Sequence, residues 1–303
     1  MTDRRPTQQV IINVDLTSRK VWQEPVPAED AADYIGGRGI NAKILYERVP
    51  KGLDPMSPDN LLIFGTGALN GTLAPCSGRM TITTKSPATG LYLKSSSGGH
   101  LGAEMKRAGV DYLVVSGASE TPVYLWIQDG EVEIRPADHL WGRGTRETDT
   151  RLKQELQDRK VQTAVIGQAG ENRVLCANIN ISRHNFASRG GTGAVMGAKG
   201  LKAVAVRGSH TIRVEDEPGF KELGKQIRRD IAEDGTANAL HMFGTSGFVE
   251  GLDMAGMLGS MNFSRAGIEG AKRLGSQHVA EIGYFKGRKS CHSCPLGCHR
   301  LVR

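Results

Sequence analysis

Short apolar runs alternate with turns and amphipathic stretches over the first two thirds of the chain. Apolar positions within residues 10–14 and 21–22 predict a β-hairpin over residues 8–24. A second hairpin is predicted over residues 123–134, with Asp129 and Gly130 at its turn. Further buried strands are predicted at residues 61–64, 80–84, 112–115 and 161–166. Helical spacing of apolar positions predicts helices at residues 40–48, 100–108 and 145–156.

The same order of elements recurs further along the chain. The strand at 161–166 is followed by a glycine-rich turn at 167–170, a strand at 174–181, a helix at 192–198 and a strand at 204–206. After about residue 210 the strand signals fade, and a helix is predicted over residues 220–232. We therefore expect one domain over residues 1–210 and the beginning of a helical domain over residues 211–303.

A shift of 91 residues aligns two segments of the first domain without gaps. The identical pairs are Ser97 and Ser188, Gly99 and Gly190, Gly102 and Gly193, Ala103 and Ala194, Met105 and Met196, Gly109 and Gly200, Val115 and Val206, and Gly117 and Gly208. Eight identities in one register exceed what glycine content alone explains, so we predict an internal duplication.

Each copy contains a glycine-rich loop that leads into a helix. The loops lie at residues 95–99 and 189–191, and Arg79 and Arg189 are close to them in sequence. Unpaired backbone N–H groups and the helix dipole make such positions suitable for anions. The glycines could equally serve only to allow tight turns between strand and helix. As a pair, the loops predict one divided or doubled anionic ligand.

Composition narrows the class of protein. With 39% hydrophobic and 23% charged residues among 303, the chain is typical of globular proteins. Its formal net charge of +7 suits an anionic cofactor or an acidic partner, while few aromatics and no arginine-rich run argue against nucleic acid. No apolar stretch approaches the roughly 20 residues of a membrane span, and no secretory signal is visible. We expect a cytoplasmic protein without a membrane span.

Three of the five cysteines, Cys291, Cys294 and Cys298, are spaced C-x2-C-x3-C. Such a run suits zinc or an iron–sulfur cluster, because thiolates must converge on one centre. The radical-forming clusters that bind S-adenosylmethionine use the reverse spacing. His292 or His299 could complete a Cys3His zinc site, and a glycine-rich β module with a structural zinc ion is the alternative hypothesis. Cys76 and Cys176 are expected to be small core residues.

Several common sites are missing from the sequence. There is no phosphate-binding G-x-x-x-x-G-K-[ST] loop, no complete dinucleotide fingerprint, no H-E-x-x-H and no G-x-S-x-G elbow. These absences direct attention to the two glycine-rich loops and the cysteine run.

Taken together, these segments resemble the aldehyde ferredoxin oxidoreductase family. The matching segments occur in family order and include residues 84–90, 97–104, 140–142, 166–172, 189–197 and 291–298. The resemblance implies an α+β fold whose first domain is a saddle of two β-sheets with pseudo-twofold symmetry, followed by the start of an α-helical domain. It also implies a tungsten or molybdenum ion held by two pyranopterins, a magnesium ion bridging the pterin phosphates, and a [4Fe-4S] cluster.

Site residues follow from the resemblance position by position. The implied pterin contacts are Arg79, Ser96 and Gly98 in the first half and Asn185, Phe186, Ser188 and Arg189 in the second. Cys291, Cys294 and Cys298 correspond to the first three cluster ligands. The family commonly has Asn at the position of Ser96 and Arg-Ala at Asn185-Phe186, which indicates a different substrate or pterin arrangement.

The implied activity is oxidation of an aldehyde or related small molecule, with electrons passing through the cluster to ferredoxin or a similar acceptor. A homodimer or a complex with an iron–sulfur subunit is compatible with the family. Family chains are roughly twice as long as this one, and their fourth cluster cysteine and catalytic residues lie in the C-terminal half. We therefore interpret the chain as the N-terminal portion of such an enzyme.

Overall fold

The computed structural model describes residues 8–303. The chain divides into two compact units. Of the described residues, the N-terminal unit comprises 8–72 and 77–215, and the C-terminal unit comprises Leu73–Cys76 and Asp216–Arg303. A four-residue segment from far upstream thus belongs to the C-terminal unit, a feature that no sequence pattern indicated.

The first six strands form one sheet of the N-terminal unit. They are β1 (Val10–Asp15), β2 (Lys20–Pro25), β3 (Leu62–Gly65), β4 (Met80–Lys85), β5 (Tyr92–Ser97) and β6 (Tyr112–Ser116). Their spatial order is β2-β1-β6-β3-β4-β5, with β1 and β6 parallel and every other neighbouring pair antiparallel. The hairpin predicted over residues 8–24 is confirmed as β1 and β2.

A second six-stranded sheet repeats this topology. Its strands are β7 (Val123–Gln128), β8 (Glu131–Pro136), β9 (Gln162–Val165), β10 (Ile179–Ile181), β11 (Asn185–Ala187) and β12 (Leu201–Arg207). The order from the other edge is β8-β7-β12-β9-β10-β11, and again only one pair, β7 and β12, is parallel. Every strand therefore has a counterpart, which is the arrangement expected of a duplicated domain.

Short helices connect the strands of the N-terminal unit. They are α1 (Ala28–Tyr34), α2 (Arg38–Arg48), α3 (Leu101–Arg107), α4 (Thr145–Glu155), α5 (Gln168–Glu171) and α6 (Thr192–Ala198), with a 3-10 turn at Asp138–Leu140. The helices α3 and α6 each follow the edge strand of their sheet, β5 and β11. Their first residues are 91 positions apart, as the sequence repeat predicts.

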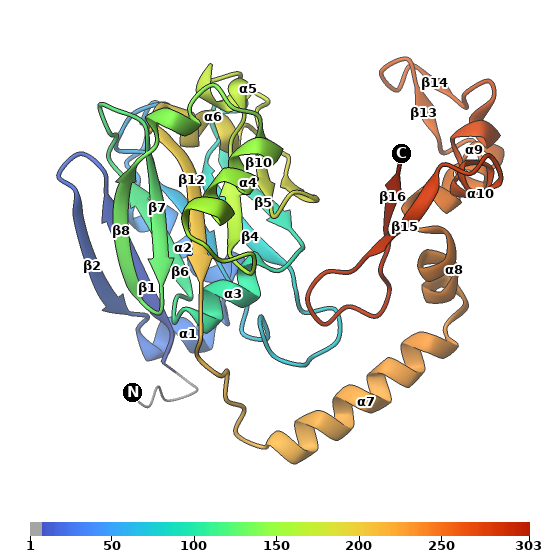
Figure 1. Ribbon diagram of the computed structural model, residues 1–303, viewed down its shortest axis with the longest axis horizontal. Coiled ribbons are helices and arrows are strands. Elements are labelled where there is room, and N and C mark those ends of the chain that lie inside the picture. Colours follow the sequence, from blue (N-terminus) through green and yellow to red (C-terminus); the bar gives the residue numbers. More distant parts are fainter. Residues whose placement is uncertain (1–7) are drawn as a thin grey trace. The chain divides into compact units, whose positions relative to one another are not determined.

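The largest hydrophobic core combines residues of both sheets with α3 and α6 (Figure 1). Phe64 of β3, Leu125 of β7 and Met196 of α6 are among its fully buried members. A second core packs α2 against β1, β3 and β6, and a third packs α4 against β7, β9 and β12. Each fully buried aliphatic or aromatic side chain contributes about 1.5–3 kcal/mol, so this layered packing stabilises the unit.

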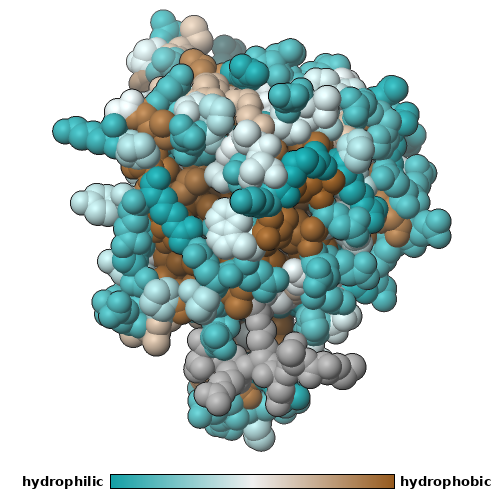
Figure 2. Space-filling view, turned by 90° about the vertical axis from the view of Figure 1, so that its left-hand side faces the viewer, coloured by the Kyte–Doolittle hydropathy of each residue, from teal (hydrophilic) through white to brown (hydrophobic). Residues whose placement is uncertain are grey.

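The two sheets are tied together at the edge formed by their hairpins. Arg19 donates a hydrogen bond to the carbonyl oxygen of Ile134 at 2.9 Å, and Gln23 donates to that of Gly130 at 3.1 Å. Seen from the side of β2 and β8, the surface is mostly hydrophilic, with hydrophobic residues gathered in its middle (Figure 2). Val132 and Ile134 of β8 are partly buried and pack against the core between the sheets.

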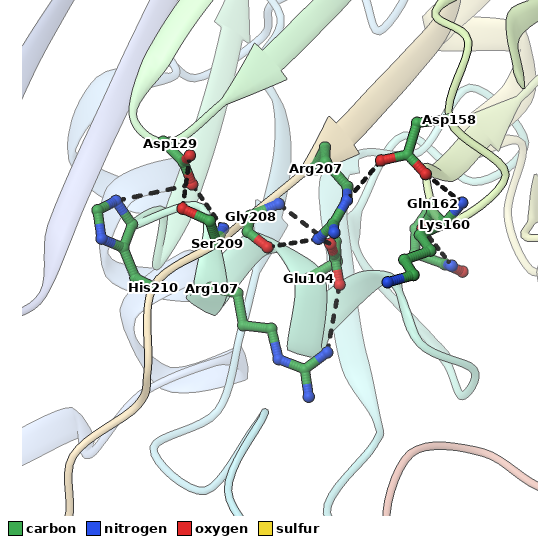
Figure 3. Close-up of polar contacts among 10 residues, drawn as sticks. All are labelled: Glu104, Arg107, Asp129, Asp158, Lys160, Gln162, Arg207, Gly208, Ser209 and His210. Atoms are coloured by element: carbon green, nitrogen blue, oxygen red, sulfur yellow. Dashed lines mark hydrogen bonds and ion pairs between the residues drawn. The ribbon is translucent and has the colours of Figure 1, made fainter.

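A polar network joins the last strand of the second sheet to α3 of the first half (Figure 3). One carboxylate oxygen of Glu104 accepts from Arg207 at 2.7 Å and from the Gly208 N–H at 3.0 Å. Arg207 also donates to Asp158 at 2.7 Å. Beyond it, the backbone N–H of Ser209 donates to Asp129 in the β7–β8 turn at 2.6 Å. The network fixes the chain where it leaves the second sheet.

The C-terminal unit is helical with two small hairpins. Its elements are α7 (Glu217–Glu233), α8 (Gly235–Phe243), α9 (Val249–Met254), α10 (Ser276–Glu281), β13 (Gly259–Ser260), β14 (Arg265–Ala266), β15 (Phe285–Lys289) and β16 (His299–Val302), with 3-10 turns at Thr245–Phe248 and Ala271–Leu274. The helix predicted over residues 220–232 is confirmed as α7. The two hairpins were not predicted from the sequence.

The structure corrects two predicted elements of the N-terminal unit. The strand predicted over residues 174–181 begins only at Ile179, and the glycine-rich turn at 167–170 contains the short helix α5. Val174 and Leu175 are exposed, so their apolar character does not signal a buried strand. No helix within residues 8–303 is long and apolar enough to cross a membrane.

Candidate functional site

The two glycine-rich loops lie next to each other in the N-terminal unit. The edge strands that lead into them, β5 and β11, are in contact although they belong to different sheets. The backbone N–H of Arg189 donates to the hydroxyl of Ser95 at 3.2 Å. The hydroxyl of Ser86 donates to the carbonyl oxygen of Gly190 at 2.7 Å. The duplication thus brings both loops to one place on the surface.

Glycine is required where the loops meet. Gly99 has a φ of +98°, and a Cβ atom there would lie 2.7 Å from the side-chain nitrogen of Asn185. Gly190 and Gly191 also have left-handed backbones, with φ of +64° and +86°. A side chain at these positions would be strained and would fill the junction. The glycines therefore serve the close approach of the loops, whatever ligand they bind.

The seven residues implied as pterin contacts all belong to this region or to the strands that support it. Ser96 is in β5 and pairs with Thr81 of β4, while Arg79 directly precedes β4. Gly98 follows β5, and the second-half residues occupy β11 and the loop after it, namely Asn185, Phe186, Ser188 and Arg189. The side chains of Arg79, Ser188 and Arg189 are exposed, and Phe186 is 46% exposed.

This arrangement suits an anionic ligand with a flat organic part. Arg79 and Arg189 offer two guanidinium groups that could pair with phosphate oxygens. Exposed Phe186 offers an aromatic surface. The helices α3 and α6 have only 7 residues each, so their dipoles add little. Arg79, Arg189 and the backbone N–H groups of the loops are therefore the candidate contacts for an anion, rather than the helix dipoles.

The cysteine run lies in the C-terminal unit, in the loop between β15 and β16. Cys291, Cys294 and Cys298 are half-buried thiols. The N–H of Cys294 donates to the carbonyl oxygen of Cys291 at 3.2 Å, which closes a turn between the two thiols. Gly297 has a φ of +53°, in the left-handed region that favours glycine.

Basic side chains hold this loop in place. Arg300 donates to the carbonyl oxygens of Gly297 at 2.8 Å and His241 at 2.6 Å. A ring nitrogen of His241 lies 3.1 Å from the carbonyl oxygens of both Pro295 and Leu296. Burial and the nearby charge of Arg288 lower the pKa of Arg300, while the thiol of Cys298 has the opposite effect. The positive charge around the loop favours a thiolate-rich, anionic centre.

Cys76 is the thiol that the sequence interpretation misplaced. The expectation that Cys76 and Cys176 are core residues is wrong, because both are exposed. The sulfur of Cys76 lies 3.6 Å from that of Cys294, within the C-terminal unit. Burial, followed by the bond to Cys294, raises the pKa of the Cys76 thiol to about 11. No spacing rule could find this thiol, since 218 residues separate the two cysteines.

The three thiols of the cysteine run suit a metal that prefers sulfur ligands, although they do not yet lie around a common centre. Within residues 8–303, no three His, Cys, Asp or Glu side chains are close enough together to hold a metal ion as they stand. The zinc alternative would add His292 or His299. His299 lies in β16, and burial lowers its pKa. The cysteine run on its loop thus provides suitable ligands in an open arrangement.

Comparison with known proteins covers both units. Residues 11–208 match the family model described as the N-terminal domain of aldehyde ferredoxin oxidoreductase. Residues 222–303 match the model of domains 2 and 3 of the same family. The first match alone covers more than half of the chain.

Curated relatives agree with the family models. The chain is 40% identical over 292 residues to a tungsten-containing aldehyde ferredoxin oxidoreductase of Pyrococcus abyssi, covering 96% of this chain and 48% of the relative. It is 33% identical to the WOR-like subunit of an aliphatic sulfonate oxidoreductase of Pyrococcus furiosus, covering 73% of this chain and 38% of the relative. The chain spans about half the length of the tungsten-containing relatives that it matches.

A solved structure shows the same fold. The active-site complex BamBC of benzoyl coenzyme A reductase, bound to 1,5-dienoyl-CoA, matches with a TM-score of 0.85 and 35% identity. The match covers 99% of this chain and 47% of that chain. Together with the two family models and the duplicated pair of sheets, it shows that this chain belongs to the aldehyde ferredoxin oxidoreductase family.

Proposed function

We propose that this chain forms the cofactor-binding portion of a tungsten- or molybdenum-dependent oxidoreductase. The observation that carries the proposal is the meeting of the two glycine-rich loops, because a ligand with two similar halves would need two similar sites. The names of the tungsten-containing relatives support tungsten as the metal. The bound group would supply the centre at which the substrate exchanges two electrons.

The residues of the N-terminal unit would hold the pterins. Arg79 and Arg189 would bind the pterin phosphates, one in each half, and a magnesium ion would bridge these phosphates. Ser96, Asn185 and Ser188 would donate or accept hydrogen bonds at the pterin rings. Gly98 would allow the ligand to approach the backbone closely, and Phe186 would cover an apolar part of it. The role of these residues is binding and orientation.

Electrons would leave through a [4Fe-4S] cluster bound by Cys291, Cys294 and Cys298. Cysteine thiolates are the usual ligands of such clusters. The basic side chains of Arg288 and Arg300 near the run would stabilise the negative charge of the centre. Ferredoxin or a similar electron-transfer protein is the proposed acceptor. Reduced cysteine thiols are consistent with a reducing compartment such as the cytoplasm.

The substrate proposed is an aldehyde or a related small molecule. The relatives carry names of different activities, which include aldehyde, aliphatic sulfonate and glyceraldehyde-3-phosphate oxidoreductases. This chain has Ser96 and Asn185-Phe186 where the family commonly has Asn and Arg-Ala. These changes remove one positive charge from the site, which favours a different pterin arrangement or substrate. A homodimer or a complex with an iron–sulfur subunit is part of the proposal, in line with the subunit names of two relatives.

Metal and pterin analysis tests the proposal. The complete protein, purified without oxygen from cells supplied with tungstate and molybdate, should contain tungsten or molybdenum, pterin and about four irons for each chain. Arg79→Ala and Arg189→Ala should each weaken pterin retention about tenfold, because each loses a charge-assisted bond to phosphate. Arg146→Ala, an exposed substitution on α4, is the matched control.

One result would reject the proposal in favour of the alternative. A colourless protein with one zinc ion, no iron and no pterin would indicate a structural Cys3His site with His292 or His299.

A further inference from the structure

Cys76 is placed against the cysteine run by several contacts of its own segment. Its backbone N–H donates to the carbonyl oxygen of Ser293 at 3.0 Å. The hydroxyl of Ser293 donates in turn to the carbonyl oxygen of Leu73 at 3.0 Å. Arg228 of α7 donates to that same carbonyl at 2.6 Å and to the Ser293 hydroxyl at 2.9 Å. All of these residues belong to the C-terminal unit.

These contacts make the position of the thiol well defined. Cys76 and Ser293 both have left-handed backbones, with φ of +59° and +51°. Non-glycine residues keep this conformation only where surrounding contacts hold it. The backbone bond between the two residues therefore fixes the direction in which the Cys76 side chain leaves the chain.

The distance between the two sulfurs distinguishes two roles for Cys76. In a four-iron cluster each thiolate binds a different iron, so two ligand sulfurs stand further apart than on one metal ion. Two sulfurs bound to a single tetrahedral ion are about 3.8 Å apart for bonds of about 2.3 Å. The observed 3.6 Å is below that value and suits an S–H···S hydrogen bond. A thiol that donates such a bond keeps its proton, whereas a ligand of the cluster must lose it.

We propose that the thiol of Cys76 donates a hydrogen bond to the sulfur of Cys294 and thereby raises the reduction potential of the cluster. The inference rests on the proposed function, in which Cys294 binds iron. A hydrogen bond withdraws negative charge from the ligand sulfur. It stabilises the reduced cluster more than the oxidised one, since the reduced cluster carries one more electron. Cys76 is thus a positioning and tuning residue that acts through Cys294.

An EPR-monitored redox titration of the complete, anaerobically purified protein tests this role. Cys76→Ala should make the midpoint potential more negative. The expected size is about a tenfold change in the equilibrium constant for one-electron reduction, which corresponds to about 59 mV. Cys76→Ser keeps an O–H donor and should stay close to the wild-type potential. Cys176→Ala is the control, because Cys176 is an exposed cysteine of the N-terminal unit. All three variants should keep the wild-type iron content.

A measurement on the wild-type protein needs no substitution. In electron–nuclear double resonance of the reduced cluster, a strongly coupled proton should disappear after exchange into D2O. The same signal should be missing from Cys76→Ala in H2O. These two results together assign the proton to the Cys76 thiol.

Three outcomes would overturn the inference, and they differ from one another. An unchanged potential in Cys76→Ala would show that the thiol has no influence, while the proposed cluster stands. Loss of iron, or a three-iron signal, in Cys76→Ala would show that Cys76 is itself a ligand. Zinc without iron in the wild-type protein would reject the proposed function together with this inference.

Discussion

The two halves of the N-terminal unit share a topology but use it differently at equivalent helices. Glu104 of α3 and Val195 of α6 occupy the same position of the repeat. Both are buried, yet Glu104 is bonded to Arg207 and Gly208, whereas Val195 belongs to the hydrophobic core. At this position the first copy thus forms hydrogen bonds to the other half, whereas the second copy packs in the hydrophobic core.

The position two residues further along the same helices differs in a second way. Lys106 of α3 pairs with Asp111 at 2.5 Å, while its counterpart in α6 is Gly197. A Cβ atom at Gly197 would overlap the carbonyl oxygen of Gly170 in α5. In the first half, the described residues 66–79 between β3 and β4 contain no helix equivalent to α5. The comparison teaches that duplication preserved the order of the strands, whereas the contacts of each helix adapted to what lies next to it.

The largest effect should come from giving α6 the residue of α3. We expect Val195→Glu to destabilise the fold by about 4 kcal/mol, because it buries a carboxylate among core residues. Denaturant unfolding at neutral pH measures this loss. Val195→Ala, the control for lost volume alone, should cost about 2 kcal/mol. Equal losses in the two variants would contradict the difference between the helices.

A side chain at Gly197 should disturb the close contact between α6 and α5, which is the second difference between the two halves. Gly197→Ala forces α6 away from α5, and we expect a loss of about 3 kcal/mol in the free energy of unfolding. The control is Gly144→Ala, since Gly144 has a φ of −67° and nothing lies within 4 Å of its added Cβ. Because Gly144 is the N-cap residue of α4, this control should cost at most about 1 kcal/mol. A tolerant Gly197 would mean that the α5–α6 contact is not tight in solution.

Removing the charge of Glu104 should weaken the hydrogen bonds that join α3 to the second half. Glu104→Gln keeps the size of the side chain but weakens its bonds to Arg207 and the Gly208 N–H, at a cost of about 2 kcal/mol. Thermal unfolding, together with hydrogen exchange of the Gly208 amide, measures this change. Glu131→Gln, on an exposed position of β8, should have little effect. Unchanged exchange at Gly208 would argue against the network.

A smaller, pH-dependent effect should come from Lys199, whose counterpart in the first half is Ala108. Its ammonium group bonds to the carbonyl oxygens of Pro58 at 2.9 Å and Gly117 at 3.0 Å. Burial lowers the pKa of Lys199 to about 7 from an ordinary value of 10.5. Between these two values the unfolded chain binds more protons than the folded one, so stability rises with pH.

The expected slope is about 1 to 1.3 kcal/mol per pH unit from pH 7.5 to 9.5. Lys199→Met removes this group, and the difference in stability between the two proteins should therefore change with pH over that range. Denaturant midpoints at several pH values give the comparison. Parallel pH profiles would indicate that Lys199 keeps an ordinary pKa.

Much of the fold could be predicted because the repeat and the strand patterns are local. The helix at residues 192–198 was predicted with the bounds of α6, and both long hairpins were found. The strand β5 was missed, since its polar sequence Tyr92–Ser97 lacks an apolar face. It pairs with β4, so its strand conformation is determined by the neighbouring strand.

The candidate site was predictable only where its residues follow one another in the chain. The two loops and the cysteine run are contiguous motifs, whereas Cys76 reaches Cys294 through the folding of a distant segment. The sequence identifies the chemical type of such a residue but not its neighbour. Contacts of this kind depend on tertiary structure.

The contact between β5 and β11 has a consequence for solubility. Edge strands expose unpaired N–H and C=O groups that can recruit strands of other molecules. In this unit the edges β5 and β11 face each other, and the hairpin edges β2 and β8 are linked by the side chains of Arg19 and Gln23. The duplication therefore places the edge strands of each sheet next to those of the other sheet. This arrangement protects the protein against intermolecular strand addition and aggregation.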